Sequence, residues 1–168
     1  MKTKLIITVV LAAVAALPLT AAEGAVGTPI THELLWMMKR VGTPVVSPDG
    51  RWVVVSVLEP AYDPDKEVSD LWLVPADASA APRRITNTRA KENGVAWSPD
   101  SRSIAFSTRR EGDEVEQIYI LDLAGGGEAR RLTDVVTGAS SPKWRPDGKA
   151  ILFESEVWPN AADDEANR

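Results

Sequence analysis

The feature that most constrains this fold is a ten-residue pattern that occurs three times along the chain. Each copy places a Pro-Asp turn between an apolar or aromatic residue and a run that is mostly apolar. The copies begin at Val46, Trp97 and Trp144, with the sequences VSPDGRWVVV, WSPDSRSIAF and WRPDGKAILF. Their prolines, at positions 48, 99 and 146, are 51 and 47 residues apart. A recurrence at this spacing predicts a repeated structural unit.

Two shorter patterns follow each of the first two copies in the same order. DLWLV at 70–74 corresponds to QIYIL at 117–121, and RRIT at 83–86 corresponds to RRLT at 130–133. The distance from the proline to the first of these patterns is 23 residues in one unit (to Leu71) and 19 in the other (to Ile118). All other spacings agree, so the extra residues fall in one polar loop between Glu59 and Ser69, as expected for a repeated unit with a loop insertion.

Each unit is predicted to contain four short strands, which in the second unit span about 94–98, 103–108, 117–122 and 130–133. Pro-Asp-Gly suits a tight turn between the first two strands, because proline presets φ, aspartate bonds to nearby backbone and glycine accepts a positive φ. Ser101 replaces that glycine, so the second turn is expected to be strained or of another type. The middle strands are nearly continuous apolar runs, which predicts sheets buried on both faces.

Four-stranded units of this length, buried between neighbours, are typical of β-propeller blades. We therefore predict an all-β fold: a partial β-propeller of two four-stranded blades plus the first hairpin of a third, preceded by a signal peptide and a short helix. The predicted segments are a signal peptide at 1–22, a lead-in at 23–42 and an incomplete propeller at 43–168, with blades at about 43–86, 94–133 and 141–168. Closed propellers have about 4–8 blades, so we expect the chain to be the N-terminal part of a longer protein.

The first 22 residues have the order of a secretory signal peptide. A basic start (Met1–Lys4) precedes the apolar stretch Leu5–Leu19 and the small residues Thr20-Ala-Ala, with cleavage expected after Ala22. The apolar stretch is interrupted by Pro18 and is shorter than the roughly 20 residues that a membrane-spanning helix needs. The mature protein is thus predicted to be secreted or periplasmic, without a membrane anchor.

A short helix is predicted between the signal peptide and the first blade, over Thr31–Arg40. Thr28 or Thr31 suits its N-cap, and Lys39, Arg40 and Gly42 suit its end. Four apolar residues share one face at helical spacing, which we expect to pack against the propeller: Leu34, Met37, Met38 and Val41.

Composition argues against several classes of function. The formal charge is −5 and the pI is about 5.0, which disfavours nucleic-acid binding. The absence of cysteine excludes disulfides and thiolate zinc sites, and a single histidine, His32, disfavours a histidine metal centre. His32 is expected to have a surface or capping role on the predicted helix.

No catalytic, cofactor-binding or metal-binding residue is predicted in this chain, and no cofactor is expected. The string nearest to a nucleophile elbow, Gly138-Ala-Ser-Ser-Pro142, has proline where the last glycine is required, so a plain loop is the better interpretation. Asp63–Glu67 lacks the glycine and the later glutamate of a calcium loop. Asp163–Glu165 is interpreted as a solvated loop, and Gly125–Gly127 as a turn.

Three arginine pairs offer guanidinium groups for carboxylate recognition: Arg83-Arg84, Arg109-Arg110 and Arg130-Arg131. Two of these pairs occupy the same repeat position, which favours a structural or surface role. Four tryptophans on predicted strands are expected to pack between blades: Trp52, Trp72, Trp97 and Trp144.

The order of signal peptide, short helix, VGTPVVSPDG at 41–50 and repeats resembles the prolyl oligopeptidase family of serine peptidases, in particular its acylaminoacyl-peptidase-like branch. The resemblance implies an N-terminal propeller that admits peptides to a C-terminal α/β-hydrolase domain. The catalytic Ser-Asp-His residues belong to that domain, which is absent here. The implied partners are therefore the chain's own hydrolase domain and peptide substrates.

The alternative is a TolB-like periplasmic propeller that binds protein partners without catalysis. Such propellers share the Pro-Asp-Gly repeats but are expected to carry a sizeable α/β domain before the blades. Only the short segment 23–42 separates the expected cleavage site from the repeats, which favours the peptidase. The sequence beyond Arg168 is the observation that separates the two.

Overall fold

The computed structural model describes residues 29–164, 166 and 167. The chain divides into two compact units, 1–30 and 31–168, and the strands all belong to the second. The predicted signal peptide and its cleavage site lie outside the described residues. Within the described range, no helix is long and apolar enough to cross a membrane.

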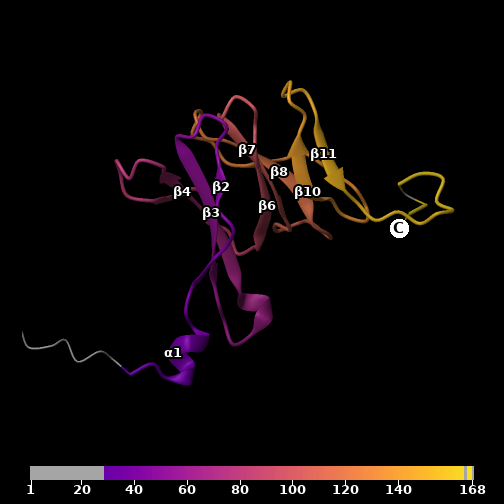
Figure 1. The fold of residues 1–168 in the computed structure, drawn as a ribbon. Coiled ribbons are helices and arrows are strands. Elements are labelled where there is room, and N and C mark those ends of the chain that lie inside the picture. Colours follow the sequence, from indigo (N-terminus) through magenta and orange to yellow (C-terminus); the bar gives the residue numbers. More distant parts are fainter. Residues whose placement is uncertain (1–28, 165, 168) are drawn as a thin grey trace, which may run out of the picture. The chain divides into compact units, whose positions relative to one another are not determined.

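Three antiparallel sheets follow one another along the chain (Figure 1). The first contains β1 (Arg40–Val41), β2 (Val45–Val46), β3 (Trp52–Glu59), β4 (Val68–Pro75) and β5 (Arg83–Arg84). The second contains β6 (Glu92–Trp97), β7 (Ser103–Thr108), β8 (Gln117–Asp122) and β9 (Arg130–Arg131), and the third contains β10 (Ser140–Trp144) and β11 (Ile151–Glu154). These sheets, called blades 1, 2 and 3 below, confirm the predicted all-β partial propeller.

Blade 2 shows how closely the repeat determines the local structure. Its two middle strands have the predicted limits. The first strand begins two residues earlier than predicted, at Glu92, and the last ends two residues earlier, at Arg131. β7 and β8 pair in register from Ser103 and Asp122 to Thr108 and Gln117.

The Pro-Asp turns of all three blades adopt one conformation. Gly50 and Gly148 have φ values of 70° and 71°, and Ser101 has a φ of 59°. Ser101 thus accepts the left-handed conformation that normally favours glycine. The expectation of strain at Ser101 is confirmed, and the alternative of a different turn type is wrong.

Side-chain hydrogen bonds explain why the turn is kept without its glycine. The Asp100 Oδ1 atom accepts from Ser98 Oγ (2.6 Å) and from the Arg102 N–H (3.1 Å). The corresponding aspartate of blade 1, Asp49, makes the same two bonds. Ser101 adds a contact between blades, because its Oγ accepts from the Asp49 N–H at 3.1 Å.

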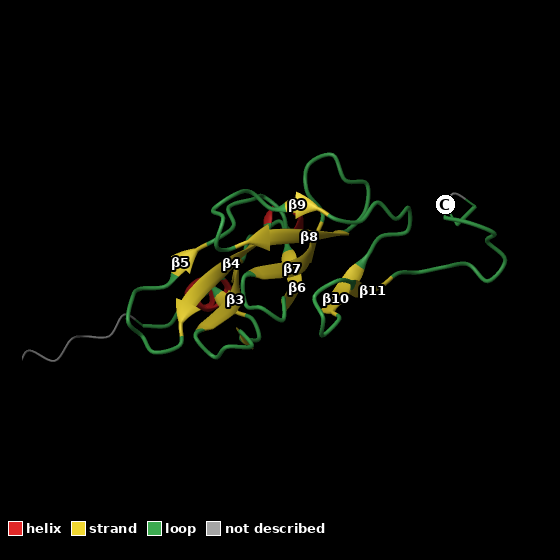
Figure 2. Ribbon diagram, turned by 90° about the horizontal axis from the view of Figure 1, so that it is seen from above, coloured by secondary structure: helices red, strands yellow, loops and turns green. Residues whose placement is uncertain are grey.

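Figure 2 shows the strands of the three sheets from above. Two apolar clusters fill the spaces between these blades. The cluster between blades 1 and 2 consists of Val54, Leu71, Leu73, Trp97, Ile104, Phe106, Tyr119 and Leu121. The smaller cluster between blades 2 and 3 consists of Ala105, Ile118, Ile120 and Ala139. Because alternate residues of β7 enter different clusters, both faces of blade 2 are buried, as the apolar runs predicted.

The lead-in helix differs from the prediction in length and in packing. Thr31 caps α1 (His32–Trp36) as predicted, with its Oγ1 accepting from the Leu34 N–H at 3.1 Å. The helix ends four residues earlier than predicted, because Arg40 and Val41 form β1 and pair with Leu58 and Val57 near the end of β3.

This pairing carries α1 past the end of the sheet, beside the long loop that contains the 3-10 helix η1 (Pro64–Lys66) (Figure 1). Tyr62 of that loop donates from its hydroxyl to Glu33 Oε1 at 2.9 Å. The predicted packing of the helix face against the propeller is wrong, since the four apolar side chains assigned to it are exposed: Leu34, Met37, Met38 and Val41.

Candidate functional site at the loop end of blades 1 and 2

The antiparallel register gathers three loops at the end of the blades opposite the Pro-Asp turns. They are the loop from β3 to β4, the connection from β5 to β6, and the loop from β7 to β8. A hollow of about 860 Å³ lies between the latter two and is lined by Thr88, Arg89, Ala90, Arg109, Arg110, Glu111, Gly112 and Asp113. A second hollow of about 770 Å³ shares Arg89, Ala90 and Arg109 with it.

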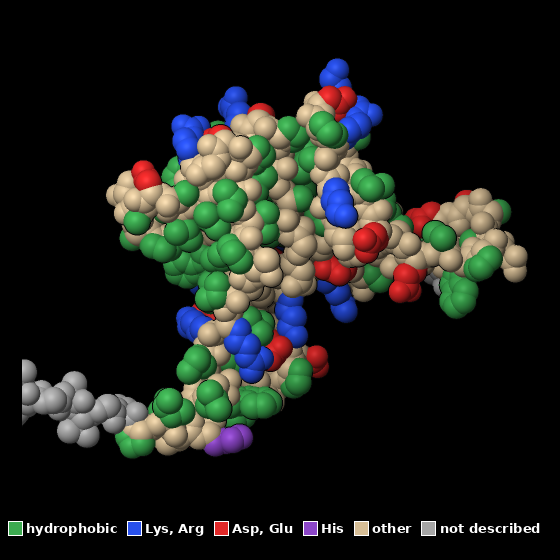
Figure 3. All heavy atoms as spheres, viewed as in Figure 1, with side chains coloured by type: hydrophobic (Ala, Val, Ile, Leu, Met, Phe, Trp, Pro, Cys, Tyr) green, Lys and Arg blue, Asp and Glu red, His purple; other side chains and the backbone are tan. Residues whose placement is uncertain are grey.

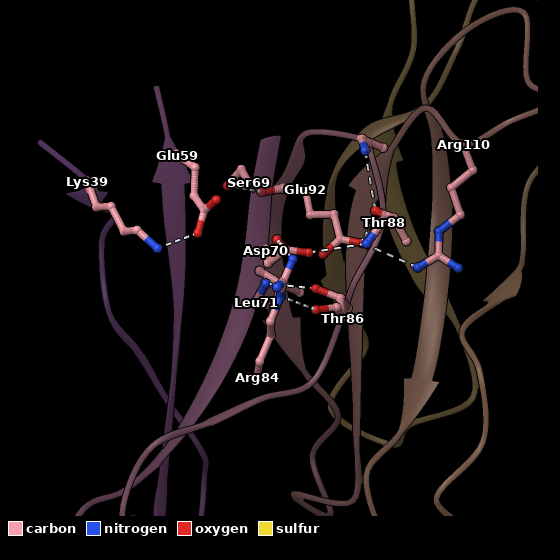
Figure 4. Close-up of polar contacts among 11 residues, drawn as sticks. Lys39, Glu59, Ser69, Asp70, Leu71, Arg84, Thr86, Thr88, Glu92 and Arg110 are labelled. Carbon is pink, nitrogen blue, oxygen red and sulfur yellow. Dashed lines mark hydrogen bonds and ion pairs between the residues drawn. The ribbon is translucent and has the colours of Figure 1, made fainter. Parts of the chain in front are cut away.

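Beside the first hollow, a set of polar side chains joins blade 1 to blade 2 (Figure 4). We call it the inter-blade polar cluster, and it consists of Asp70, Arg84, Thr86, Thr88, Glu92 and Arg110. On the blade 1 side, buried Asp70 forms an ion pair with Arg84 and accepts from the Thr88 N–H at 3.2 Å. The Thr86 Oγ1 atom accepts from the Leu71 N–H at 2.8 Å, which ties the end of β5 to β4.

Glu92, the first residue of β6, is the blade 2 member of this cluster and is fully buried. Its Oε1 atom lies 3.3 Å from Arg110 Nη2 and accepts from Thr88 Oγ1 at 3.2 Å. Burial raises the pKa of the Glu92 carboxyl, because loss of water outweighs the opposing effects of its hydrogen bonds and of Arg110. The Ser69 hydroxyl donates to the Glu92 carbonyl at 3.5 Å and adds a further link to β4.

Arg110 is held in place by aromatic rings as well as by charge. Its guanidinium carbon lies 4.7 Å from the Tyr119 ring centroid and 5.8 Å from that of Phe106. Three buried atoms around it have no hydrogen-bond partner in the described part of the chain: Arg110 Nε, Glu92 Oε2 and Thr108 Oγ1. Since buried polar groups are usually paired, these three atoms have unused donor and acceptor capacity.

Asp113 closes the far side of the hollow. Its Oδ2 atom accepts from the Tyr119 hydroxyl (2.8 Å) and the Arg110 N–H (3.0 Å), and its Oδ1 atom lies 3.1 Å from Arg131 Nη1. The loop from β7 to β8 is therefore anchored to its own blade. The lining of the hollow contains Arg89, Arg109 and Arg110, whose guanidinium groups are suited to binding an anionic group.

The arginine pairs identified in the sequence differ in the contacts that their side chains make. Arg84 and Arg131 donate from Nε to the carbonyls of Thr86 (3.0 Å) and Thr133 (2.8 Å), so the shared repeat position has the structural role that was predicted. Arg83 and Arg130, the first member of each pair, are exposed. Arg110 belongs to the polar cluster, and its neighbour Arg109 lines both hollows.

The tryptophans confirm the predicted packing between blades at equivalent positions. Trp97 Nε1 donates to the Val45 carbonyl (2.9 Å), and Trp144 Nε1 donates to the Ala96 carbonyl (3.2 Å). Trp97 thus bonds β6 to β2 of blade 1, and Trp144 bonds β10 to β6 of blade 2. Trp52 packs against the larger apolar cluster, whereas Trp72 is half-buried and belongs to neither cluster.

The other sequence candidates occupy loops, turns and the helix. In the segment Gly138–Pro142, the Gly138 carbonyl accepts from Ser155 Oγ (2.7 Å), and the serines begin β10. His32 opens α1 and is exposed.

The acidic and glycine-rich segments are also local structure. Asp63 caps η1, and Asp163 accepts from the Ala166 N–H. Gly125–Gly127 form the turn after β8, where the Gly125 N–H donates to Asp122. No group of three or more metal-ligating side chains occurs among residues 29–164, 166 and 167.

Glu92 and Arg89 are the site residues that sequence reasoning missed. Both lie in the predicted connection between blades, where a charged residue is normally solvated. Asp70 carried a weak signal, because it begins the otherwise apolar sequence DLWLV.

A protein-family model described as the TolB beta propeller domain matches residues 33–158. The chain belongs to this family of β-propellers. Its sequence is 34% identical over 86 residues to dipeptidyl-peptidase 5 of Porphyromonas gingivalis, a match that covers 51% of this chain and 12% of that protein. The chain thus spans only a small part of the length of this relative.

Solved structures support the fold. The acylaminoacyl peptidase of Pyrococcus horikoshii matches with a TM-score of 0.55 at 17% identity, covering 77% of this chain and 20% of that one. TolB of Acinetobacter baumannii matches with a TM-score of 0.53 at 21% identity, covering 70% of this chain and 27% of that one. The predicted relation to peptidase propellers is confirmed by the match to dipeptidyl-peptidase 5, and the acylaminoacyl peptidase structure has the same fold.

Proposed function

We propose that this chain is the propeller part of a secreted serine peptidase that acts on peptides. In this proposal, a catalytic α/β-hydrolase domain of the same protein carries the Ser-Asp-His residues, and the propeller limits which substrates reach it. The observation that carries the proposal is the 34% identity to a dipeptidyl-peptidase over 86 residues.

The exposed apolar surface beside the propeller is consistent with a further domain. Figure 3 shows hydrophobic side chains around α1, and a larger group of them over β2 and β3 of blade 1. Leu35, Trp36 and Met38 are each about half exposed, at 58%, 47% and 54%. An apolar surface of this kind is typical of an interaction site, and the proposed occupant is the hydrolase domain.

The proposed location is outside the cytoplasm. The order of basic, apolar and small residues at positions 1–22 supports export and cleavage after Ala22. N-terminal sequencing of the protein from its native host tests this point, with Glu23 as the expected first residue.

The peptidase proposal is tested with the protein encoded by the full reading frame. A serine-directed fluorophosphonate is expected to label one serine outside residues 1–168, and the protein is expected to release dipeptides from the N-terminus of unblocked peptides. Chain 1–168 alone is expected to remain unlabelled. Absence of both labelling and cleavage in the full protein, or labelling of a serine in this chain, would contradict the proposal.

A TolB-like protein-binding role is the second candidate. It is supported by the family model over residues 33–158 and by the structural likeness to TolB. A reading frame that ends after the remaining blades, together with capture of a protein partner, would favour this role over catalysis.

A further inference from the structure

The hollow of about 860 Å³ at the loop end of blades 1 and 2 contains arginine groups that nothing in the fold requires there. Arg89 is exposed and makes no hydrogen bond or ion pair with the described residues. Within the described part of the chain, Arg109 donates from its Nε to the Asp113 backbone carbonyl at 3.4 Å. Arg89 comes from the connection between blades 1 and 2 and Arg109 from the loop between β7 and β8, and both line the same hollow.

Arg110 provides a fixed third guanidinium in the same lining. The Tyr119 and Phe106 rings and the buried carboxylate of Glu92 hold it, and its side chain is only 19% exposed. Among the described residues, its buried Nε has no acceptor, and the nearby, fully buried hydroxyl of Thr108 has no partner. A held side chain loses less conformational entropy when it binds a ligand, and the unpartnered N–H requires an acceptor.

Two of the carboxylates around this lining, Asp113 and Glu92, already have partners within blade 2. Asp113 bonds to Arg131 and Tyr119, and Glu92 pairs with Arg110. Glu111 is exposed and lies in the lining next to the arginines. Planar guanidinium groups bind carboxylates through paired N–H donors, and a volume of this size is within the range of small-ligand sites.

We propose that this hollow binds the carboxylate group of a peptide, with Arg89 and Arg109 as its ligands and Arg110 as the fixed base of the site. The inference rests on the proposed function for the nature of the ligand. The carboxylate comes either from the C-terminus of the peptide or from an acidic side chain. Arg89, Arg109 and Arg110 are binding residues and take no part in bond cleavage.

The test measures binding, so that it does not depend on catalysis. The full-length protein, treated with a fluorophosphonate to prevent turnover, is titrated in a calorimeter with Ala-Ala-Ala, its C-terminal amide, and Ala-Glu-Ala amide. We expect Arg89→Gln to weaken binding of a carboxylate-bearing peptide by about tenfold, as loss of a charged hydrogen-bond donor predicts. Amides without a carboxylate are expected to bind more weakly and to be insensitive to the substitution.

Arg102→Gln is the matched control, because Arg102 is exposed in the Pro-Asp turn at the opposite end of blade 2. It removes the same charge and is expected to leave all affinities unchanged. Stronger binding of Ala-Ala-Ala assigns the C-terminal carboxylate as the ligand, and stronger binding of Ala-Glu-Ala amide assigns an acidic side chain. Equal affinity for all three peptides, or equal losses with Arg89→Gln and Arg102→Gln, would overturn the inference.

The two proposals fail separately in this design. Carboxylate-dependent binding without any peptidase activity would leave the site in place and refute the peptidase. Peptidase activity without a carboxylate preference in binding would refute the carboxylate site and leave the peptidase proposal in place.

Discussion

The two spaces between blades arise from the same repeat but are filled differently. Between blades 1 and 2, a cluster of eight buried apolar residues is joined to buried Asp70 and Glu92 and their arginine partners. Between blades 2 and 3, the apolar cluster has four buried residues, and the residue at the repeat position of Asp70 is the neutral Gln117. There, Gln117 Oε1 accepts from Thr133 Oγ1 at 2.7 Å, and its Nε2 donates to the Val135 carbonyl at 2.7 Å.

The comparison shows that the repeat specifies strands and turns, whereas the chemistry between blades is specific to each pair. Gln117 stands at the repeat position of Asp70 and makes neutral hydrogen bonds, so a buried charge at this position is not a requirement of the repeat. Ion pairs of this kind add little to stability when intact, but breaking one is costly. Their position next to the arginine-lined hollow is therefore consistent with a functional use.

The largest expected loss of unfolding free energy comes from the apolar cluster between blades 1 and 2. Phe106→Ala removes a fully buried ring and is expected to destabilise the fold by about 4 kcal/mol. Ile118→Val, a smaller change at a fully buried position of the second cluster, is expected to cost about 1 kcal/mol. Urea unfolding followed by tryptophan fluorescence measures both, and equal losses would contradict the difference described here.

Breaking the buried ion pair is expected to have the next largest effect. Arg110→Met leaves the Glu92 carboxylate buried without its cation and should cost about 3 kcal/mol. Arg109→Met changes the exposed neighbour in the same way and should cost less than about 0.5 kcal/mol. A loss below 1 kcal/mol for Arg110→Met would show that this pair is not an essential link between the blades.

The pH dependence of stability distinguishes the buried carboxyl from those in the turns. Because burial raises the pKa of Glu92 above its ordinary value of 4.5, the folded state holds the Glu92 proton more tightly than the unfolded state does. Its contribution to stability is complete below pH 4.5 and is lost as the pH rises through the folded-state pKa. The stability of Glu92→Gln relative to the native protein should therefore increase from pH 4 to pH 7, and parallel pH profiles would contradict this.

The carboxyl of Asp49 is expected to change the stability with pH in the opposite direction. Hydrogen bonds from Ser47 and Arg51 lower the pKa of its carboxyl to about 2, from an ordinary value of 3.8. Its contribution is thus present above pH 3.8 and is lost as the pH falls toward 2. Asp49→Asn should show its largest loss of stability above pH 4 and converge with the native protein near pH 2.

The smallest effect is expected at Ser101. Ser101→Gly relieves a left-handed backbone conformation, which is worth about 1 kcal/mol, but removes the hydrogen bond to Asp49, which is worth about 0.5 kcal/mol. The net change in unfolding free energy is expected to lie within about 0.5 kcal/mol. A loss above 2 kcal/mol would show that this contact between turns matters far more than the backbone strain.

The strands, turns and inter-blade tryptophans could be predicted because each depends on a pattern that the chain repeats. The length of α1 could not, because Arg40 and Val41 satisfy the helical pattern and yet pair with Val57 and Leu58, sixteen or more residues away. The polar cluster depends on packing between blades, which brings Asp70 and Glu92 together across the connection from β5 to β6. No local sequence pattern predicts that contact.

The most direct test of the proposed role of the propeller compares one cleavage sequence in two contexts. The full-length protein is given a short unblocked peptide and a folded protein that displays the same sequence in an exposed terminal segment. The proposed role predicts rapid cleavage of the peptide and at least a hundredfold slower cleavage of the folded protein. Equal rates for the two substrates, or no cleavage of either, would contradict it.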